Sequence, residues 1–298
     1  MRPAPPFDTL RLTTGAAELV LAPAAGGAIL SWRVDSQPML HGARAAAASG
    51  WNPLDMASFP LVPFSNRIGS GAFLWDGVRH QLPPSALPDR HAIHGVGWRR
   101  AWRVIESAAD RAVLRHEHEA SADWPWAYAA EQRFRLTAFG LEIAMTATNA
   151  ADRPVPLAFG LHPYFDAAGA HLRFAASPIW RSGIDGLPAR SEPPGADRDF
   201  REGLGVTATD LDNGYDGWDG RAAIWWADRP YALRITSDLP CAVVYTPASA
   251  RFFCFEPVPH SNNALNLAGA GRAMPVVMPG EAFSAHVRFE VLPREAVQ

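Results

Sequence analysis

The stretch YAAEQRFRLTAFGLEIAMTATN, residues 128–149, decides the fold class of this chain. Apolar and polar residues alternate along both of its halves, which meet at the pair Phe139-Gly140. One face collects the following residues: Tyr128, Ala130, Gln132, Phe134, Leu136, Leu141, Ile143, Met145 and Ala147. A period of two on both sides of a short break is typical of a β-hairpin. The stretch therefore predicts two antiparallel strands with one buried face.

The same alternation recurs along the chain. FSAHVRFEVL near the C-terminus puts one apolar set in register: Phe283, Ala285, Val287, Phe289 and Val291. AVLRHEHEA, from Ala112, and RFFCFEP, from Arg251, also indicate strands. The 27 Pro and 24 Gly residues are spread throughout, as expected for many short strands joined by turns. We therefore predict an all-β fold, a large antiparallel β-sandwich that forms a single domain over residues 1–298.

Two segments are predicted to lie outside the strands, and no long stretch has a convincing period of 3.6 residues. ARAAAASG, from Ala43, has helix propensity but no apolar stripe, so we expect a loop or one helical turn. SEPPGADRDFREGLG, from Ser191, has the composition of an exposed loop.

Composition excludes several classes of function. All 27 basic residues are Arg, so neither a Schiff-base lysine nor a phosphate-loop lysine exists. The formal net charge of −3 favours neither nucleic acid nor an anionic membrane as a partner. Cys241 and Cys254 are the only cysteines, which excludes a disulfide framework and a Cys-rich zinc site. The N-terminus lacks a signal-peptide pattern, and no apolar run approaches the roughly 20 residues that span a bilayer. We expect a soluble cytoplasmic protein, a monomer or homodimer.

Four short islands set one ionisable residue each beside glycine, proline or aromatic residues. They are FPLVPFSNRIGSGAF around Arg67, HAIHGVGWRRAW around His94, FGLHPYF around His162 and FFCFEPVPHSNNALN around Glu256. A charged group in an apolar setting must be paired, hydrogen-bonded or shifted in pKa. The islands therefore predict one cleft that is assembled from distant segments and holds acid, base and orienting groups.

Glu256 and His162 are the strongest candidates for proton transfer. Glu256 lies in an aromatic strand, where a raised pKa would make it a good general base. His162 precedes Pro163 and has the unperturbed pKa for proton exchange near neutral pH. An edge-strand Glu and a core His are the structural alternatives, and the presence of both residues in aromatic surroundings favours function.

The remaining candidates are weaker one by one. Gly95, after His94, would let a ligand or backbone come close. Asn66 and Arg67 beside a glycine would hold sugar hydroxyls or a carboxylate, although a single loop Arg is more often in a surface ion pair. DLDNGYDGWDG, residues 210–220, fits an acidic turn, a calcium loop or a hydroxyl-binding site, without EF-hand spacing. HEHE at 116–119 lies in an alternating strand, so we expect a solvated or partly exposed strand in place of a metal site.

Together the islands resemble the aldose 1-epimerase (galactose mutarotase) family, from about Gly26-Gly27 to the C-terminus. The matching motifs occur in family order: Asn66-Arg67-Ile68, His94-Gly95, His162 to Phe165 and Glu256-Pro257. The resemblance implies a large β-sandwich and an isomerase that interconverts the α and β anomers of a free aldose, such as galactose or glucose, with no cofactor or metal.

The resemblance also implies a division of roles within the site. Glu256 is the base at the C1 hydroxyl and His162 the acid at the ring oxygen, which His94 supports. Arg67 and Asn66 hold sugar hydroxyls together with an aspartate, for which Asp212 fits best and Asp216 is the second candidate.

Three alternatives stay open at this point. A hexose-phosphate 1-epimerase of the same superfamily would need an arginine clamp for phosphate. A non-catalytic carbohydrate-binding protein would stack sugars on Trp and Tyr rings. A glycosidase would need two carboxylates at about 5–5.5 or 6.5–9.5 Å, for which Glu256 and Asp212 are the candidates.

Overall fold

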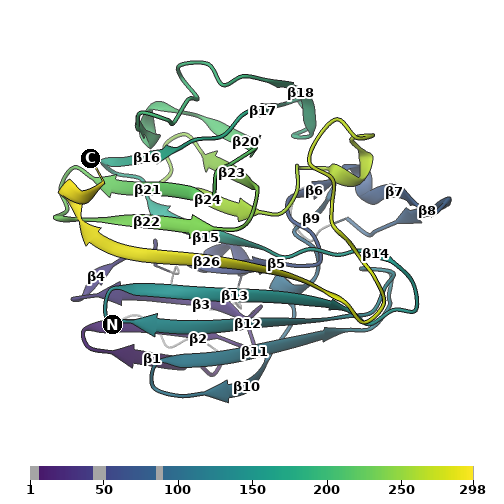
Figure 1. Ribbon diagram of the computed structural model, residues 1–298, viewed down its shortest axis with the longest axis horizontal. Coiled ribbons are helices and arrows are strands. Elements are labelled where there is room, and N and C mark those ends of the chain that lie inside the picture. Colours follow the sequence, from purple (N-terminus) through teal and green to yellow (C-terminus); the bar gives the residue numbers. More distant parts are fainter. Residues whose placement is uncertain (1–6, 43–51, 85–89, 298) are drawn as a thin grey trace.

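The computed structural model describes residues 7–42, 52–84 and 90–297 (Figure 1). The segment ARAAAASG, for which we expected a loop or one turn, lies outside the described residues. Within the described ranges no α-helix occurs, and the strands are joined by turns and six 3-10 helices. In the same ranges no helix is long and apolar enough to cross a membrane. The prediction of an all-β fold is confirmed.

One large layer is an antiparallel sheet of nine strands within the described residues, and it runs across the front of Figure 1. In spatial order its strands are β10 (Arg103–Ser107), β11 (Arg111–His118), β12 (Tyr128–Thr137), β13 (Gly140–Asn149), β26 (Ala282–Pro293), β22 (Tyr231–Ser237), β21 (Arg221–Trp226), β16 (Ala170–Phe174) and β19 (Leu204–Gly205). The predicted hairpin is β12 and β13, which pair in register from Tyr128 opposite Asn149 to Thr137 opposite Gly140.

The other large layer is an antiparallel sheet of eleven strands within the described residues. In spatial order they are β1 (Leu10–Thr14), β2 (Ala17–Ala22), β3 (Ala28–Val34), β5 (Ser58–Leu61), β15 (Gly160–Asp166), β24 (Phe252–Val258), β23 (Cys241–Thr246), β20 (Leu211–Asp216), β17 (Ile179–Ser182) and β18 (Pro188–Glu192), with β4 (Gln37–Pro38) beside β3. The islands of His162 and Glu256 form the neighbouring central strands β15 and β24.

Short elements decorate the sandwich. Three two-stranded ribbons pair β14 (Val155–Pro156) with β25 (Val276–Val277), β6 (Arg67–Ile68) with β9 (Ala92–Ile93), and β7 (Ala72–Trp75) with β8 (Val78–Gln81). The 3-10 helices are η1 (Pro53–Asp55), η2 (Gly69–Gly71), η3 (Gly97–Arg99), η4 (Val206–Ala208), η5 (Ala264–Asn266) and η6 (Arg294–Ala296). Figure 1 shows that β6, β7, β8 and β9 gather at one end of the sandwich.

The main core lies between the two large sheets. Alternate residues of β12, β13 and β26 point inward and are buried, which follows from the period of two in the sequence. The ring centroids of Trp32 on β3 and Phe289 on β26 lie 5.8 Å apart across the two layers. Burial of side chains of this size contributes about 1.5–3 kcal/mol each.

The segment from Ser191 corrects the prediction of an exposed loop in part. Ser191 and Glu192 end β18, and Leu204 and Gly205 form β19. Phe200 is buried, because its ring stacks on Phe174 at a centroid distance of 5.1 Å. A single aromatic residue therefore anchors an otherwise polar segment to the core.

The face of the eleven-stranded sheet that points away from the main core carries a second, smaller cluster. Phe253 and Phe255 of β24 pack into the main core, whereas Cys254 lies in the second cluster with Phe59 and Tyr164. The alternation along β24 puts Glu256 on the same side as Cys254. Both faces of β24 are covered, so the strand is buried along nearly its whole length.

Candidate active site

A cavity of about 450 Å³ opens on that second face of the eleven-stranded sheet. Six residues singled out from the sequence line it: Asn66, Arg67, His94, His162, Asp212 and Glu256. They come from β15, β20, β24 and the segments around β6 and β9, which are far apart in the chain. The predicted convergence of the four islands on one cleft is therefore what the geometry shows.

Glu256 and His162 form the floor of the cavity. The Nε2 atom of His162 lies 3.3 Å from Oε1 of Glu256, and the two side chains are only 6% and 3% exposed. Glu256 belongs to a central strand, because β24 lies between β15 and β23, so the edge-strand alternative is wrong. Aromatic rings confine the imidazole, with Phe59 and Tyr164 at centroid distances of 4.5 and 4.8 Å.

Burial sets the protonation of this pair. Loss of hydration raises the pKa of Glu256 well above its usual value, the nearby Asp212 carboxylate raises it further, and Arg67 opposes both. Burial also lowers the pKa of His162 to about 3. Burial therefore favours the uncharged forms of both groups, a protonated Glu256 carboxyl and a neutral His162 imidazole. The two groups lie in one short contact in which either can carry a proton.

His94 completes the floor as a neutral donor. The backbone N–H of Asn66 donates to Nδ1 of His94 over 3.2 Å, so a neutral ring carries its proton on Nε2. Burial, His162 and Arg67 all lower the pKa of His94, which keeps the ring neutral. The rings of His94 and His162 meet edge to face at a centroid distance of 5.1 Å. The site thus holds a fixed N–H donor beside the acid–base pair.

Gly95 explains the position of His94 on the cavity floor. Gly95 has a φ of +70°, and a Cβ atom there would lie 2.4 Å from the carbonyl oxygen of Val62. A side chain at this position would therefore push two backbone segments apart. We expected either a ligand or backbone to come close to Gly95, and the structure shows backbone there.

Arg67 and Asp212 form the rim of the cavity. Nη1 of Arg67 donates to Oδ2 of Asp212 over 3.1 Å, and the side chains are 17% and 36% exposed. Asn66 has a φ of +53°, and its Oδ1 accepts the N–H of Arg67 over 2.9 Å. The rim therefore presents an ion pair and a rigid turn to the cavity.

The segment after Glu256 holds the rim turn in place. Asn263 donates its N–H to the carbonyl of Arg67 over 3.0 Å and accepts the N–H of Gly69 at its Oδ1 over 2.9 Å. Nε2 of the buried His260 accepts the N–H of Ser65 over 3.3 Å. These contacts join the strand of the candidate base to the turn of the candidate hydroxyl-binding groups.

Asp216, the second candidate for the sugar-binding aspartate, lies in a closed network and does not line the cavity. Its carboxylate accepts hydrogen bonds from the indole of Trp180 at 2.7 Å and from the hydroxyl of Ser261 at 2.7 and 2.8 Å. The thiol of Cys241 adds a contact at 3.3 Å. All of these groups are buried, so of the two candidate aspartates Asp212 is the one that lines the cavity.

Sequence reasoning missed part of the cavity wall. Asn52, Asp55, Tyr245 and Phe252 also line the cavity, together with Tyr164. Asn52 caps η1, because its Oδ1 accepts the N–H of Leu54 over 3.1 Å. An Asn-Pro pair followed by an acidic residue was the available signal for this turn, although it carries no information about the cavity.

The HEHE segment is partly exposed at the end of β11, which is one of the two forms expected. His116 is buried and packs between Trp102 and Tyr128, at ring distances of 5.5 and 5.8 Å. Glu117 and Glu119 are exposed, and His118 is half-buried. His116 and Glu117 point to opposite faces of β11, as the alternation predicted, and belong to no metal-ligating group among the described residues.

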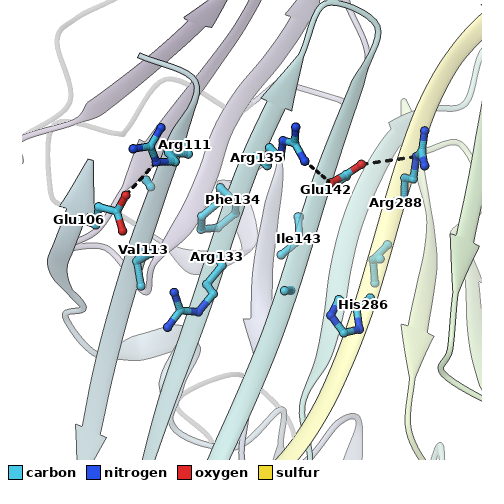
Figure 2. Close-up of a pocket in the computed structure, with 13 residues that line it drawn as sticks. Glu106, Arg111, Val113, Arg133, Phe134, Arg135, Glu142, Ile143, His286 and Arg288 are labelled. Atoms are coloured by element: carbon cyan, nitrogen blue, oxygen red, sulfur yellow. Dashed lines mark hydrogen bonds and ion pairs between the residues drawn. The ribbon is translucent and has the colours of Figure 1, made fainter. Parts of the chain in front are cut away.

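A second hollow of about 460 Å³ lies on the nine-stranded sheet (Figure 2). Five of its charged side chains partner one another: Glu106 contacts Arg111, and Glu142 lies between Arg135 and Arg288. The two hollows have nearly the same volume, so size does not identify the site. Only the first combines a buried carboxyl group, two imidazoles and an open rim, and we place the candidate active site there.

The antiparallel supersandwich and this cavity define a galactose mutarotase-like protein. The model of the aldose 1-epimerase family matches residues 8–290, and the chain belongs to that family. It is similar to the uncharacterized protein YphB of Escherichia coli strain K12, with 29% identity over 278 residues, 89% of this chain and 93% of the relative.

Solved structures agree with this assignment. A putative aldose 1-epimerase from Escherichia coli K12 has a TM-score of 0.88 at 27% identity, over 96% of this chain and 99% of that one. A galactose mutarotase-like protein from Clostridium acetobutylicum has a TM-score of 0.84 at 17% identity, over 96% and 95% of the two chains, and supports the fold alone.

Proposed function

We propose that the protein is an active aldose 1-epimerase that interconverts the α and β anomers of a free aldose. The observation that carries this proposal is the buried contact of 3.3 Å between His162 and Glu256 on the floor of a sugar-sized cavity. Anomer exchange needs one base and one acid beside the anomeric centre, and this pair supplies both.

The proton balance of the reaction fits the pair. In the productive state the carboxylate of Glu256 takes the proton of the C1 hydroxyl, while protonated His162 gives its proton to the ring oxygen. The C1–O5 bond breaks, and an open aldehyde remains beside a neutral Glu256 and a neutral His162. Rotation about the C1–C2 bond turns the carbonyl, and the reverse transfers close the ring on the other face.

Once the charged pair has formed, burial favours ring opening, because opening converts the charged pair into a neutral one. The raised pKa of Glu256 and the lowered pKa of His162 both favour the neutral forms that follow bond cleavage. The cyclic sugar requires the proton to sit on His162 first, and the contact of 3.3 Å offers a direct path from Glu256. The total number of protons on the pair stays one throughout.

The other cavity residues position the sugar in this proposal. The Nε2–H of His94 supports the ring oxygen, and Arg67 with Asp212 binds the hydroxyls farther from C1. Asn66 keeps its amide N–H₂ available, because its Oδ1 already accepts the N–H of Arg67. Tyr and Phe rings on the wall cover the apolar face of a pyranose.

The charges of the cavity favour a free sugar over a sugar phosphate. Among the described residues that line it, Asp55, Asp212 and Glu256 are acidic, and Arg67 is the basic residue. Arg67 is already paired with Asp212. A phosphate dianion would face acidic groups without an arginine clamp, whereas hydroxyl groups donate readily to carboxylates.

A polarimetric assay tests the proposal. Freshly dissolved α-glucose, α-galactose and a hexose 6-phosphate should be followed with wild-type protein, with Glu256→Gln, and with the exposed control Glu117→Gln. We expect wild type and the control to speed the change in rotation of a free sugar, with or without a chelator, because the proton transfers need no metal. Rates equal to the buffer rate for every sugar, with binding retained, would instead support a non-catalytic sugar-binding protein.

A further inference from the structure

A set of metal-ligating groups lies at and beneath the floor of the cavity, where a buried cysteine joins the two candidate proton-transfer residues. One ligand atom each of His162, Cys254 and Glu256 lies within 4.8 Å of the other two. Cys254 and Glu256 are two residues apart on β24 and share a face, and Tyr164, two residues after His162, pairs with Cys254. Adjacent strands thus fix three donors around one point.

Several polar atoms of these three residues lack hydrogen-bond partners and are available to bind an ion. Among the residues that the structure describes, Oε2 of Glu256 has no hydrogen-bond partner, although its side chain is 3% exposed. Nδ1 of His162 likewise finds no partner on another residue. Cys254 is a free cysteine with 0% exposure. Unpartnered buried acceptors are costly, and a cation bound by both carboxylate oxygens of Glu256 would remove the cost at Oε2.

The chemistry of the set matches a borderline-soft divalent cation. Zinc binds thiolate sulfur at about 2.3 Å and imidazole nitrogen or carboxylate oxygen at about 2.0–2.2 Å, usually with four ligands. Tetrahedral bonds of these lengths separate two donors by roughly 3.3–3.7 Å. Nε2 of His162 and Oε1 of Glu256, 3.3 Å apart, already have this spacing. The Cys254 sulfur starts within 4.8 Å of its partner atoms and would have to move by about 1.1–1.5 Å at most.

We propose that His162, Cys254 and Glu256 form an inhibitory site for Zn²⁺ on the floor of the cavity. The ion bonds to the thiolate of Cys254, the carboxylate of Glu256 and a nitrogen of His162, with water as the fourth ligand. The thiol proton and the proton shared by the acid–base pair leave to solvent as these bonds form. Binding itself is independent of the proposed function, and only its effect on turnover rests on that function.

Inhibition follows because the ion occupies the groups that must exchange protons. A carboxylate bound to Zn²⁺ is a weak base, and a metal-bound imidazole nitrogen has no proton to give. The chain contains a matched control for the thiol ligand. Cys241 is the second cysteine, is equally buried, and contacts Asp216 in the closed network behind the cavity.

Cobalt spectroscopy tests the site without any turnover. Co²⁺, which replaces Zn²⁺ in thiolate sites, should give a near-ultraviolet sulfur-to-metal charge-transfer band with wild type and with Cys241→Ala. The band should disappear in Cys254→Ala and in Cys254→Ser, whose folding is checked by thermal unfolding. A band of full intensity in folded Cys254→Ala, or no band in wild type, would overturn the proposal.

Inhibition by Zn²⁺ provides the second arm. We expect Cys254→Ala to keep anomer exchange and to need at least about 10-fold more Zn²⁺ for half-inhibition than wild type, since a direct ligand should matter no less than an outer-shell partner. Cys241→Ala should match wild type. A cobalt band without any turnover would contradict the proposed function alone, and turnover with no band would contradict the metal site alone.

Discussion

The floor and the rim of the cavity differ in how far their charged side chains are exposed to water. Glu256 and His162 on the floor are almost completely excluded from water, and the pKa of each shifts towards its neutral form. Arg67 and Asp212 on the rim form an ion pair that remains partly exposed. Groups that exchange protons profit from a dry environment, whereas groups that hold hydroxyls need access to the incoming sugar. The contrast predicts different kinetic consequences for changes in the two regions.

Glu256→Gln should have the largest effect. Glutamine preserves the shape and a hydrogen bond but cannot take the C1 proton, so kcat should fall by at least about 10²-fold, with a much smaller change in KM. Polarimetry at several sugar concentrations separates the two constants. If folded Glu256→Gln turns over at a near-normal rate, another carboxylate is the base, with Asp212 the first candidate.

Arg67→Ala should act on binding. Loss of a charged hydrogen bond is worth roughly 1.5–3 kcal/mol, so KM should rise by about 10- to 100-fold, with kcat reduced less. Arg190→Ala, at an exposed arginine whose side chain is 71% accessible, serves as the control. A large fall in kcat at unchanged KM would place Arg67 with the floor and remove the distinction between the two regions.

Asp212→Asn and Asp216→Asn form a matched pair at the two ends of β20. The rim variant should lower kcat/KM by about 2- to 10-fold, the worth of an ordinary hydrogen bond. The Asp216 variant should lose about 1–3 kcal/mol of folding free energy and keep its KM, because it disturbs a buried network. Urea unfolding and steady-state kinetics on both proteins provide the test, and the reverse pattern would exchange the roles of the two aspartates.

Acid should destabilise the protein through its buried histidines, a smaller effect per residue. Burial lowers the pKa of His116 to about 4 and of His162 to about 3, below the value of 6.5 in the unfolded chain. The unfolded state therefore binds more protons between about pH 6.5 and pH 4, and stability falls as the pH drops through this window. His116→Phe should flatten that fall in urea midpoints measured at pH 7 and pH 5. The exposed control His286→Asn should not, and equal slopes for wild type and His116→Phe would contradict this account.

The parts of the fold that the sequence revealed are those with short-range causes. The β12–β13 hairpin could be predicted because its partners are adjacent and its buried face repeats every second residue. The same alternation along β24 places Glu256 on the face of the sheet that points away from Phe253 and Phe255. A strand buried on both faces looks uniformly apolar in sequence, so its single carboxyl group became informative.

The undetected parts of the site depend on contacts between distant segments. Asn263 lies near the rim because it holds the backbone of Arg67 and Gly69, almost 200 positions earlier in the chain. Asp212 and Asp216 lie on the same strand, but Asp216 is hydrogen-bonded to Trp180 and Ser261 in a buried network and does not line the cavity. The burial of Phe200 could not be predicted for the same reason, because its neighbours in the sequence are polar and its partner Phe174 is distant in the chain.

Two-dimensional NMR exchange spectroscopy on an equilibrated aldose tests the central claim most directly, because it detects conversion of one anomer into the other without any coupled reaction. Wild type should give cross-peaks between the α and β H1 signals. His162→Asn, which cannot protonate the ring oxygen, should give almost none while it still broadens the sugar signals through binding. Cross-peaks of wild-type intensity in folded His162→Asn, or their absence with wild type under saturating sugar, would contradict the assignment of proton exchange to the buried His162–Glu256 pair.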